Sequence, residues 1–233
     1  MKKVGRTIIT ILILTLIVTS ILPTTSASAK TSKVTDAQLK KVMKCYTKIL
    51  SENPYKGWEG GFTAETFLLK DLNQDGVPEL IINGEAPQIF SYDLKNDKEM
   101  FIYNSWVNCI LYYSSKTKNI MYNYEWNGKK DWYFFKINNT QETDAFNVLE
   151  ALDTYSYTDG IYDEYDTTTA KKGYYKGYYG SEDSKRVKKE TIDKAIEEFV
   201  PDKEKLETTI KNTKANRSKY LGSLKQFKKY AAK

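Results

Sequence analysis

One segment of sixteen residues, 67–82, constrains the fold of this chain more than any other part of the sequence. It reads FLLKDLNQDGVPELII, with an apolar run at each end and a polar centre that holds three acids, an asparagine and a glycine. Short apolar runs bounded by turn residues predict β-strands. The segment therefore predicts a strand, a tight polar loop and a second strand.

The polar centre of this segment has the residue pattern of a calcium-binding loop. Side chains with oxygen atoms stand two residues apart, so a tight loop can turn them toward one hard cation, and Gly76 allows the sharp turn. The expected ligands are the side chains of Asp71, Asn73, Asp75 and Glu79 and the carbonyl oxygen of Val77. The sequence thus predicts one Ca²⁺ ion with a structural role, which neutralises clustered carboxylates and fixes the turn.

A polar turn without a metal is the alternative interpretation of the same residues. Asn and Asp side chains bond to the backbone in ordinary hairpin turns, and Gly supplies the positive φ that many of them need. Three acids and an asparagine in alternating register exceed what a turn requires. The sequence therefore favours calcium over the turn alone.

The spacing of the acids excludes an EF-hand and matches the pattern of another kind of calcium loop. An EF-hand needs a bidentate Glu at its twelfth position and a helix on each side, whereas the twelfth position from Asp71 is Ile82 and both flanks predict strands. The pattern D-x-N-x-D-G-x-x-E of residues 71–79 instead resembles the calcium loops of FG-GAP repeats, the blades of integrin-type β-propellers. A propeller needs several blades and the sequence holds no second copy, so the resemblance extends to the loop and not to the propeller.

The first 29 residues predict a secretory signal peptide. Lys2, Lys3 and Arg6 precede an apolar core at 8–22, and an Ala-Ser-Ala cleavage site ends at 29. An uncleaved anchor is the alternative, but an apolar stretch of roughly 15 residues is shorter than the ~20 that a spanning helix needs. We expect a secreted protein, free or non-covalently associated with a cell wall, without a transmembrane span after cleavage. The order of signal peptide, helix, loop and Tyr-rich strands resembles uncharacterised small secreted proteins of clostridia, which are Gram-positive bacteria, and this resemblance implies no activity.

Residues 30–233 predict a single domain of the α+β class, with a helix at 30–54, a β-rich part at 60–180 and a basic helical tail at 185–233. Thr35 and Gln38 fit a capping box before an apolar stripe that runs from Leu39 to Leu50. The β-rich part predicts an antiparallel meander of strands rich in Tyr and Phe, with an Asn-Gly hairpin at 127–128. Besides the two strands around the loop, the expected strands are Gln88–Leu94, Met100–Trp106, Cys109–Ser114, Ile120–Trp126 and Trp132–Ile137.

Residues 153–180 are rich in tyrosine and hold an acidic group that comprises Asp159, Asp163, Glu164 and Asp166. Strand and loop are the favoured interpretation, because such tyrosines often have one face buried in a sheet. A second cation site and a tyrosine platform that stacks on sugars are the alternatives.

The chain contains no histidine, which excludes Ser-His-Asp and Cys-His nucleophiles and His-ligated metal sites. Catalysis by carboxyl groups is not excluded, since a glycoside hydrolase needs only a pair of them at a set separation. The sequence favours a non-catalytic surface or partner-binding module, and a carboxylate-based wall-polysaccharide enzyme is the alternative. Its candidate acids are Glu59, Glu65, Glu125 and Asp131.

The charge is unevenly distributed along the mature chain. Without the signal peptide the chain keeps 33 of its 36 basic residues and all 30 acids, which does not indicate a specific nucleic-acid binder. Residues 211–233, however, contain eight basic residues and no acid. This tail predicts contact with polyanions, and a helix with a solvated lysine face is the alternative. The expected partners of the module are a cell-wall polymer, a glycan or a host surface protein.

Cys45 and Cys109 are the two cysteines of the chain, and export would permit a disulfide between them. The alternative is a pair of buried thiols that act as small apolar side chains. The sequence does not decide between these two states.

Overall fold

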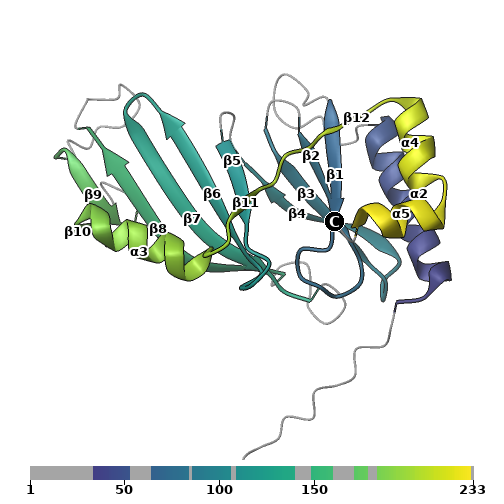
Figure 1. The fold of residues 1–233 in the computed structure, drawn as a ribbon, viewed down its shortest axis with the longest axis horizontal. Coiled ribbons are helices and arrows are strands. Elements are labelled where there is room, and N and C mark those ends of the chain that lie inside the picture. The colour runs from purple at the N-terminus through teal and green to yellow at the C-terminus, as the bar shows by residue number, and fades with distance from the viewer. Residues whose placement is uncertain are drawn as a thin grey trace, which may run out of the picture. The chain divides into compact units, whose positions relative to one another are not determined.

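The strands of this chain pair antiparallel and form two sheets in the computed structural model (Figure 1). The structure describes residues 34–52, 64–83, 86–105, 109–139, 148–159, 171–177 and 183–231, all within the compact unit Lys33–Lys233. The expected signal peptide, Glu59 and the acids at 163, 164 and 166 lie outside the described residues.

The first described helix, α2 (Asp36–Glu52), starts at the predicted capping box. The Thr35 N–H donates to Gln38 Oε1 at 2.8 Å, and the Gln38 N–H donates to Thr35 Oγ1 at 3.3 Å. These reciprocal bonds satisfy backbone donors that no helical carbonyl can reach. The apolar stripe of α2 is buried from Leu39 to Leu50, as its spacing predicts.

The first sheet has five strands in the order β12-β1-β2-β3-β4. Helices α2, α4 (Lys214–Leu221) and α5 (Leu224–Ala231) cover one of its faces, and the three lie together in Figure 1. The core on that face joins side chains of α2 to alternate residues of the strands, such as Phe67, Leu69 and Leu80. The strands are β1 (Thr66–Lys70), β2 (Glu79–Asn83), β3 (Gln88–Asp93), β4 (Lys98–Asn104) and β12 (Ile210–Lys211).

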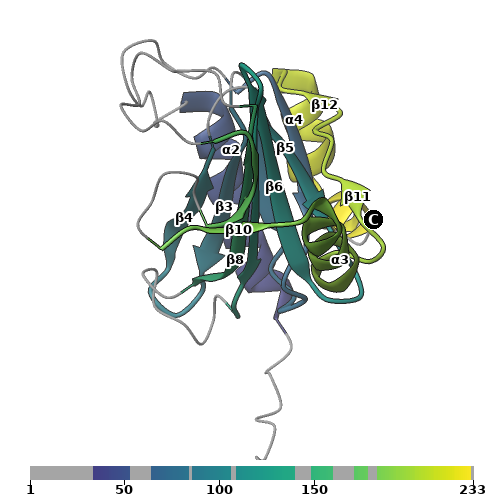
Figure 2. The same ribbon diagram turned by 90° about the vertical axis from the view of Figure 1, so that its left-hand side faces the viewer.

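The second sheet has seven strands in the order β10-β9-β8-β7-β6-β5-β11. Helix α3 (Lys189–Phe199) packs on one face, where Ile192 and Ala195 meet Phe134 (Figure 2). The opposite face shares a core with the first sheet, and Leu111 of one sheet and Ile81 of the other both lie in that core. The strands are β5 (Cys109–Tyr113), β6 (Asn119–Trp126), β7 (Lys129–Ile137), β8 (Leu149–Thr158), β9 (Gly173–Lys176), β10 (Lys185–Val187) and β11 (Glu204–Lys205).

The α+β prediction is confirmed, with a helix first, antiparallel sheets in the middle and helices at the end. The hairpin at Asn127 and Gly128 is confirmed as well, with φ values of 46° and 75° that suit a two-residue turn. The sequence did not indicate that the strands divide into two sheets. It also did not indicate β11 and β12, because two-residue strands of largely exposed side chains carry no apolar alternation.

The two cysteines are unpaired thiols, which settles the alternative left open by the sequence. Cys45 lies on α2, beside the helix-covered face of the five-stranded sheet, whereas Cys109 lies on β5 in the core between the sheets. Because the five-stranded sheet separates the two cores, the thiols cannot meet without unfolding. In the described residues, no helix is both long and apolar enough to cross a membrane.

Candidate metal site

The five predicted ligand residues lie in and beside the loop that joins β1 to β2. The strand pairing continues up to the loop, where Lys70 is opposite Glu79. Residues 71–78 therefore leave and re-enter the sheet at adjacent points, so the loop must be tight. Gln74 and Gly76 take positive φ values of 60° and 92° to achieve this turn.

Three polar side chains of the loop accept hydrogen bonds from its own backbone. Asp71 Oδ2 accepts from the Gly76 N–H at 3.0 Å, and Asn73 Oδ1 accepts from the Asp75 N–H at 3.0 Å. Asp75 Oδ1 accepts from the Val77 N–H at 2.8 Å. These bonds explain how the alternating residues form the turn, since each side chain takes up a backbone donor that the strands cannot reach.

Glu79 is fully buried at the start of β2. Its Oε2 accepts a hydrogen bond from the Leu72 N–H at 2.8 Å, and its Oε1 accepts from the Ser91 hydroxyl at 3.1 Å. A carboxylate has about four lone-pair positions, so these two bonds leave each oxygen able to accept again. Glu79 therefore holds the loop to β3 and still offers oxygen to a ligand.

The surroundings of Asp71 and Glu79 disfavour the ionised form of their carboxyl groups. Burial raises the pKa of Asp71 to about 6, and the negative charge of Asp75 adds to this shift. Burial also raises the pKa of Glu79 well above its usual range, and the charges of Asp75 and Asp71 act in the same direction. Hydrogen bonds from backbone N–H groups oppose both shifts without cancelling them. A cation at the loop would reverse these shifts, because it favours the ionised carboxylates.

One oxygen of this cluster has no hydrogen-bond partner. Asp71 Oδ1 is buried and accepts no hydrogen bond, which is costly for a carboxylate oxygen. Asp71 and Gly76 also line a surface hollow of about 420 Å³, with Pro78 and residues of α5 on its other sides. The unpartnered oxygen thus belongs to a residue that an ion can approach from the surface.

Neighbouring elements hold the loop from several sides. The Tyr46 hydroxyl of α2 donates to the Pro78 carbonyl at 2.8 Å, and the Tyr113 hydroxyl of β5 donates to the Leu72 carbonyl at 3.0 Å. Asn73 Nδ2 donates to the carbonyl of Asn138 at 3.0 Å, at the end of β7. The sequence placed Tyr46 only in the apolar stripe of its helix. A buried tyrosine needs a hydrogen-bond partner for its hydroxyl, so a tyrosine in an apolar stripe was the one signal in the sequence that could have indicated this contact.

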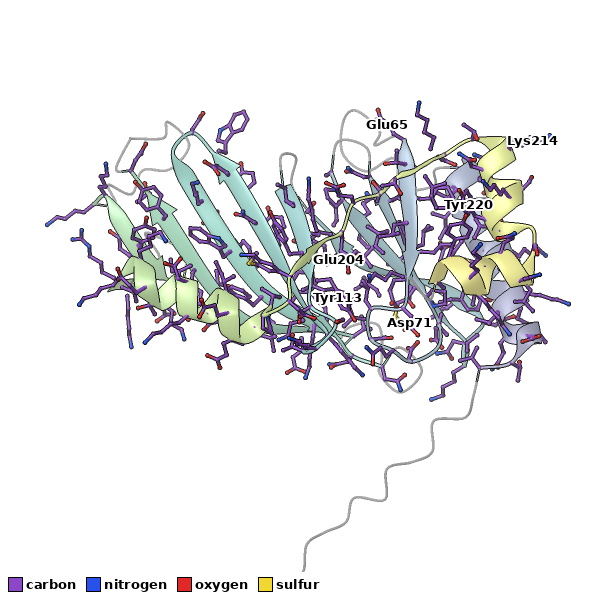
Figure 3. The ribbon with its side chains drawn as sticks, in the orientation of Figure 1. Glu65, Asp71, Tyr113, Glu204, Lys214 and Tyr220 are labelled. Atoms are coloured by element: carbon purple, nitrogen blue, oxygen red, sulfur yellow. The ribbon has the colours of Figure 1, made fainter. Side chains whose placement is uncertain are left out.

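An ion pair lies at the same junction between the two sheets. Lys70, at the end of β1, is buried, and its Nζ lies 3.0 Å from Glu204 Oε2 on β11. The ammonium group also lies 5.4 Å from the ring centre of Tyr113. Figure 3 shows Tyr113 and Glu204 close together, with Asp71 below and to one side.

The loop brings the predicted ligands into one segment but does not arrange them as a finished shell. In the part of the chain that the structure describes, no group of three or more carboxylate, thiol or imidazole side chains is placed to hold a metal ion. The side chains of Asp71, Asn73 and Asp75 are bonded to loop amides instead. Ca²⁺ binding would require these side chains to share or exchange those bonds, with Asn73 and the Val77 carbonyl supplying neutral oxygens.

The candidate acids of the alternative hydrolase do not form a facing pair in the described residues. Asp131 is opposite Tyr124 in the sheet, whereas Glu125 is opposite Lys130, so the two acids point to opposite faces. Glu65 is exposed beside β1, in the other sheet. Burial raises the pKa of Asp131 to about 6, and its Oδ1 has no hydrogen-bond partner. Asp131 is thus a half-buried acid that Glu125 does not face.

Comparison of this chain with known protein families, curated proteins and solved structures finds no match. The function therefore has to be argued from the site itself.

Proposed function

We propose that this protein is a secreted, non-catalytic calcium-binding module in which one Ca²⁺ ion has a structural role at the loop 71–79. The observation that supports this most is the unpartnered Asp71 Oδ1, which is buried beside the charges of two other acids. A polar turn alone does not need three acids so close that their charges help to raise the pKa of Asp71 and Glu79. A divalent cation removes this repulsion and supplies the missing partner of Asp71.

The proposed ligands are the side chains of Asp71, Asn73, Asp75 and Glu79 and the carbonyl oxygen of Val77. Oxygen atoms from carboxylates, an amide and the backbone are the donor set that Ca²⁺ prefers. A site in a secreted module needs an affinity of only about 10⁻⁴ to 10⁻³ M to be filled outside a cell. The bound ion would stabilise the turn between two core strands and, through Asn73 and Leu72, the junction of the two sheets.

As a surface or partner-binding module, the protein would bind a cell-wall polymer, a glycan or a host surface protein. The resemblance of the loop to FG-GAP calcium loops and the expected signal peptide support an extracellular role. A carboxylate hydrolase is less well supported, because Glu125 and Asp131 lie on opposite faces of their sheet.

Thermal unfolding tests the proposal most directly. The chain from Lys30 onward would be melted in EDTA, in millimolar Ca²⁺ and in millimolar Mg²⁺, beside the variant Asp71→Asn. We expect Ca²⁺ to raise the Tm of the wild type selectively, since a ligand of the folded state stabilises by mass action. Asp71→Asn should lose most of this rise.

The same variant separates a metal site from a polar turn. In EDTA, Asp71→Asn should equal or exceed the wild type in Tm, because it removes a buried charge whose pKa is raised. In Ca²⁺ it should be less stable than the wild type. The matched control is Asp193→Asn on the exposed face of α3, which should leave the calcium response unchanged. If the wild type is folded with the same Tm in all three buffers, the loop is a polar turn without a metal.

A further inference from the structure

The helical end of the molecule has a concentration of positive charge that the proposed calcium site does not explain. We define the helical basic face as the exposed lysines on and beside α2, α4 and α5 that have no acidic partner in the described residues: Lys40, Lys44, Lys211, Lys214, Lys225 and Lys229. Figure 3 shows Lys214 at the outer end of α4. Part of this face belongs to the C-terminal tail and part to the first helix.

Helices α2, α4 and α5 pack against one another, so the lysines on their exposed sides belong to the same helical layer. Lys228 of α5 reaches Asp36 of α2, with 2.6 Å between Nζ and Oδ1. Lys40 and Lys44 follow Asp36 at four-residue steps, so they lie along the same flank of α2, one and two turns further on. The lysines of the first helix therefore extend the basic surface of α4 and α5.

Among the described residues, few acids neutralise this end of the molecule. Asp36 is paired with Lys228, Asp97 lies 2.9 Å from Lys41, and Glu52 lies 3.9 Å from Lys48. The chain has no acid after Glu207. On α3, in contrast, four acids alternate with the lysines, and Lys189 pairs with Asp193. Uncompensated like charges repel one another. An anion that approaches the helical basic face reduces this repulsion and lowers the free energy.

The side chains around this face indicate the kind of anion. The large apolar residues exposed in the described structure are Phe101 and Trp126, on strands β4 and β6. Tyr220 and Tyr230 pack edge to face against each other, with their ring centres 4.3 Å apart, which occupies them within the helical layer. The face thus offers ammonium groups without an apolar wedge for a bilayer and without an aromatic platform for bases.

We propose that the helical basic face is a docking surface for a linear polymer of phosphate groups without bases, which it contacts through the phosphates alone. A flexible chain of anions can follow lysines that lie on three helices, and release of its counterions would supply the driving force. Binding of this polymer does not require calcium at the loop 71–79. Failure of one proposal would therefore leave the other unaffected.

The test is binding of end-labelled inorganic polyphosphate, followed by fluorescence anisotropy at several salt concentrations. The test variant combines Lys40→Gln, Lys44→Gln, Lys214→Gln and Lys225→Gln. The matched control combines Lys185→Gln, Lys188→Gln, Lys194→Gln and Lys203→Gln, which removes the same charge from exposed lysines on and around α3. Circular dichroism would verify that both variants are folded.

We expect the test variant to bind polyphosphate at least about tenfold more weakly, with a shallower dependence on salt, since each lysine near an anionic surface contributes roughly a factor of five. The control should bind like the wild type. Equal losses in the two variants, or no loss in either, would overturn the proposal.

Two further probes separate the polymer from other anions. Oligo-dT should bind no more tightly per phosphate than polyphosphate, because the face has no base-stacking residues. Vesicles that contain phosphatidylglycerol should bind weakly and be released by salt. Clear selectivity for the oligonucleotide or for the vesicles over polyphosphate would contradict the proposed ligand.

Discussion

The hydroxyl of Tyr113 on β5 donates a hydrogen bond of 3.0 Å to the carbonyl of Leu72 in the loop between β1 and β2. Tyr113 belongs to the seven-stranded sheet and Leu72 to a loop of the five-stranded sheet, and both side chains are buried in the core between the two sheets. The candidate calcium loop is therefore bonded directly to the sheet that does not contain it. The contact links the loop to the packing between the two sheets.

Replacement of Tyr113 by Phe keeps the ring but removes this hydrogen bond. The Leu72 carbonyl would then lack its partner in a buried position, and we expect the free energy of unfolding to fall by about 1–3 kcal/mol. Urea denaturation at neutral pH measures the change. Tyr175→Phe is the control, because the Tyr175 hydroxyl bonds to an exposed carbonyl at Lys171, and it should cost less than about 0.5 kcal/mol. Equal effects of the two substitutions would contradict the role given to Tyr113.

The raised pKa of Asp71 predicts how stability depends on pH when no metal is present. The folded-state pKa of about 6 lies above the ordinary value of 3.8, so the folded protein binds this proton more tightly than the unfolded chain. The contribution of Asp71 to stability is therefore greatest below the ordinary pKa and is lost as the pH rises through the folded value.

Asp71→Asn isolates this contribution from the other titrating groups. In EDTA, we expect the stability of the variant relative to the wild type to increase between about pH 4 and pH 7, and to level off at higher pH. The measurement is a set of paired urea titrations across that range. A difference that stays constant with pH would show that Asp71 ionises in the folded protein as an exposed aspartate does.

Any larger residue at position 76 is expected to lower the stability of the protein. The Gly76 φ of +92° is strained for any residue with a Cβ, and a Cβ built there would lie 3.1 Å from Val34 Cγ2. We expect Gly76→Ala to lower the free energy of unfolding by about 1–3 kcal/mol. In the double variant with Val34→Ala, the steric part of the loss should be recovered but the backbone part should remain. Full recovery in the double variant would place the whole cost in the contact with Val34.

Cys45 and Cys109 should remain thiols in the folded protein under oxidising conditions. Burial raises the pKa of each to about 11, with the charge of Glu99 adding to the effect at Cys45, so neither forms much thiolate near neutral pH. We expect slow alkylation by iodoacetamide in the folded state and fast alkylation of both in urea. The Tm should be the same with and without reductant. A loss of Tm on reduction would reveal a disulfide and contradict the topology.

Local patterns in the sequence were sufficient for most single elements. The capping box at Thr35 and Gln38 forms as predicted, because it depends on residues three positions apart. The Asn-Gly turn at 127–128 also depends on the backbone preferences of its own two residues. The α+β class follows from these local signals and from the apolar alternation of the strands.

The candidate site was predictable as a segment but not as a geometry. Spacing alone predicts that Asp71, Asn73 and Asp75 share one tight loop, and the structure has such a loop. The burial of Glu79 against Ser91, and the lack of a partner for Asp71 Oδ1, depend on β3 and on the surrounding core. The binding of calcium at this loop stays a prediction.

By itself, the sequence determined the general order of a first helix, antiparallel strands and terminal helices, and the position of one polar loop, because these depend on residues near one another in the chain. The tertiary structure alone decided that the strands divide into two sheets and that Cys45 and Cys109 lie in separate cores. It also decided that lysines of the first helix join those of the tail. These relationships join residues up to 192 positions apart, as Asp36 and Lys228 show. Such contacts are selected by the burial of apolar faces against each other, and no local pattern of residues encodes their partners.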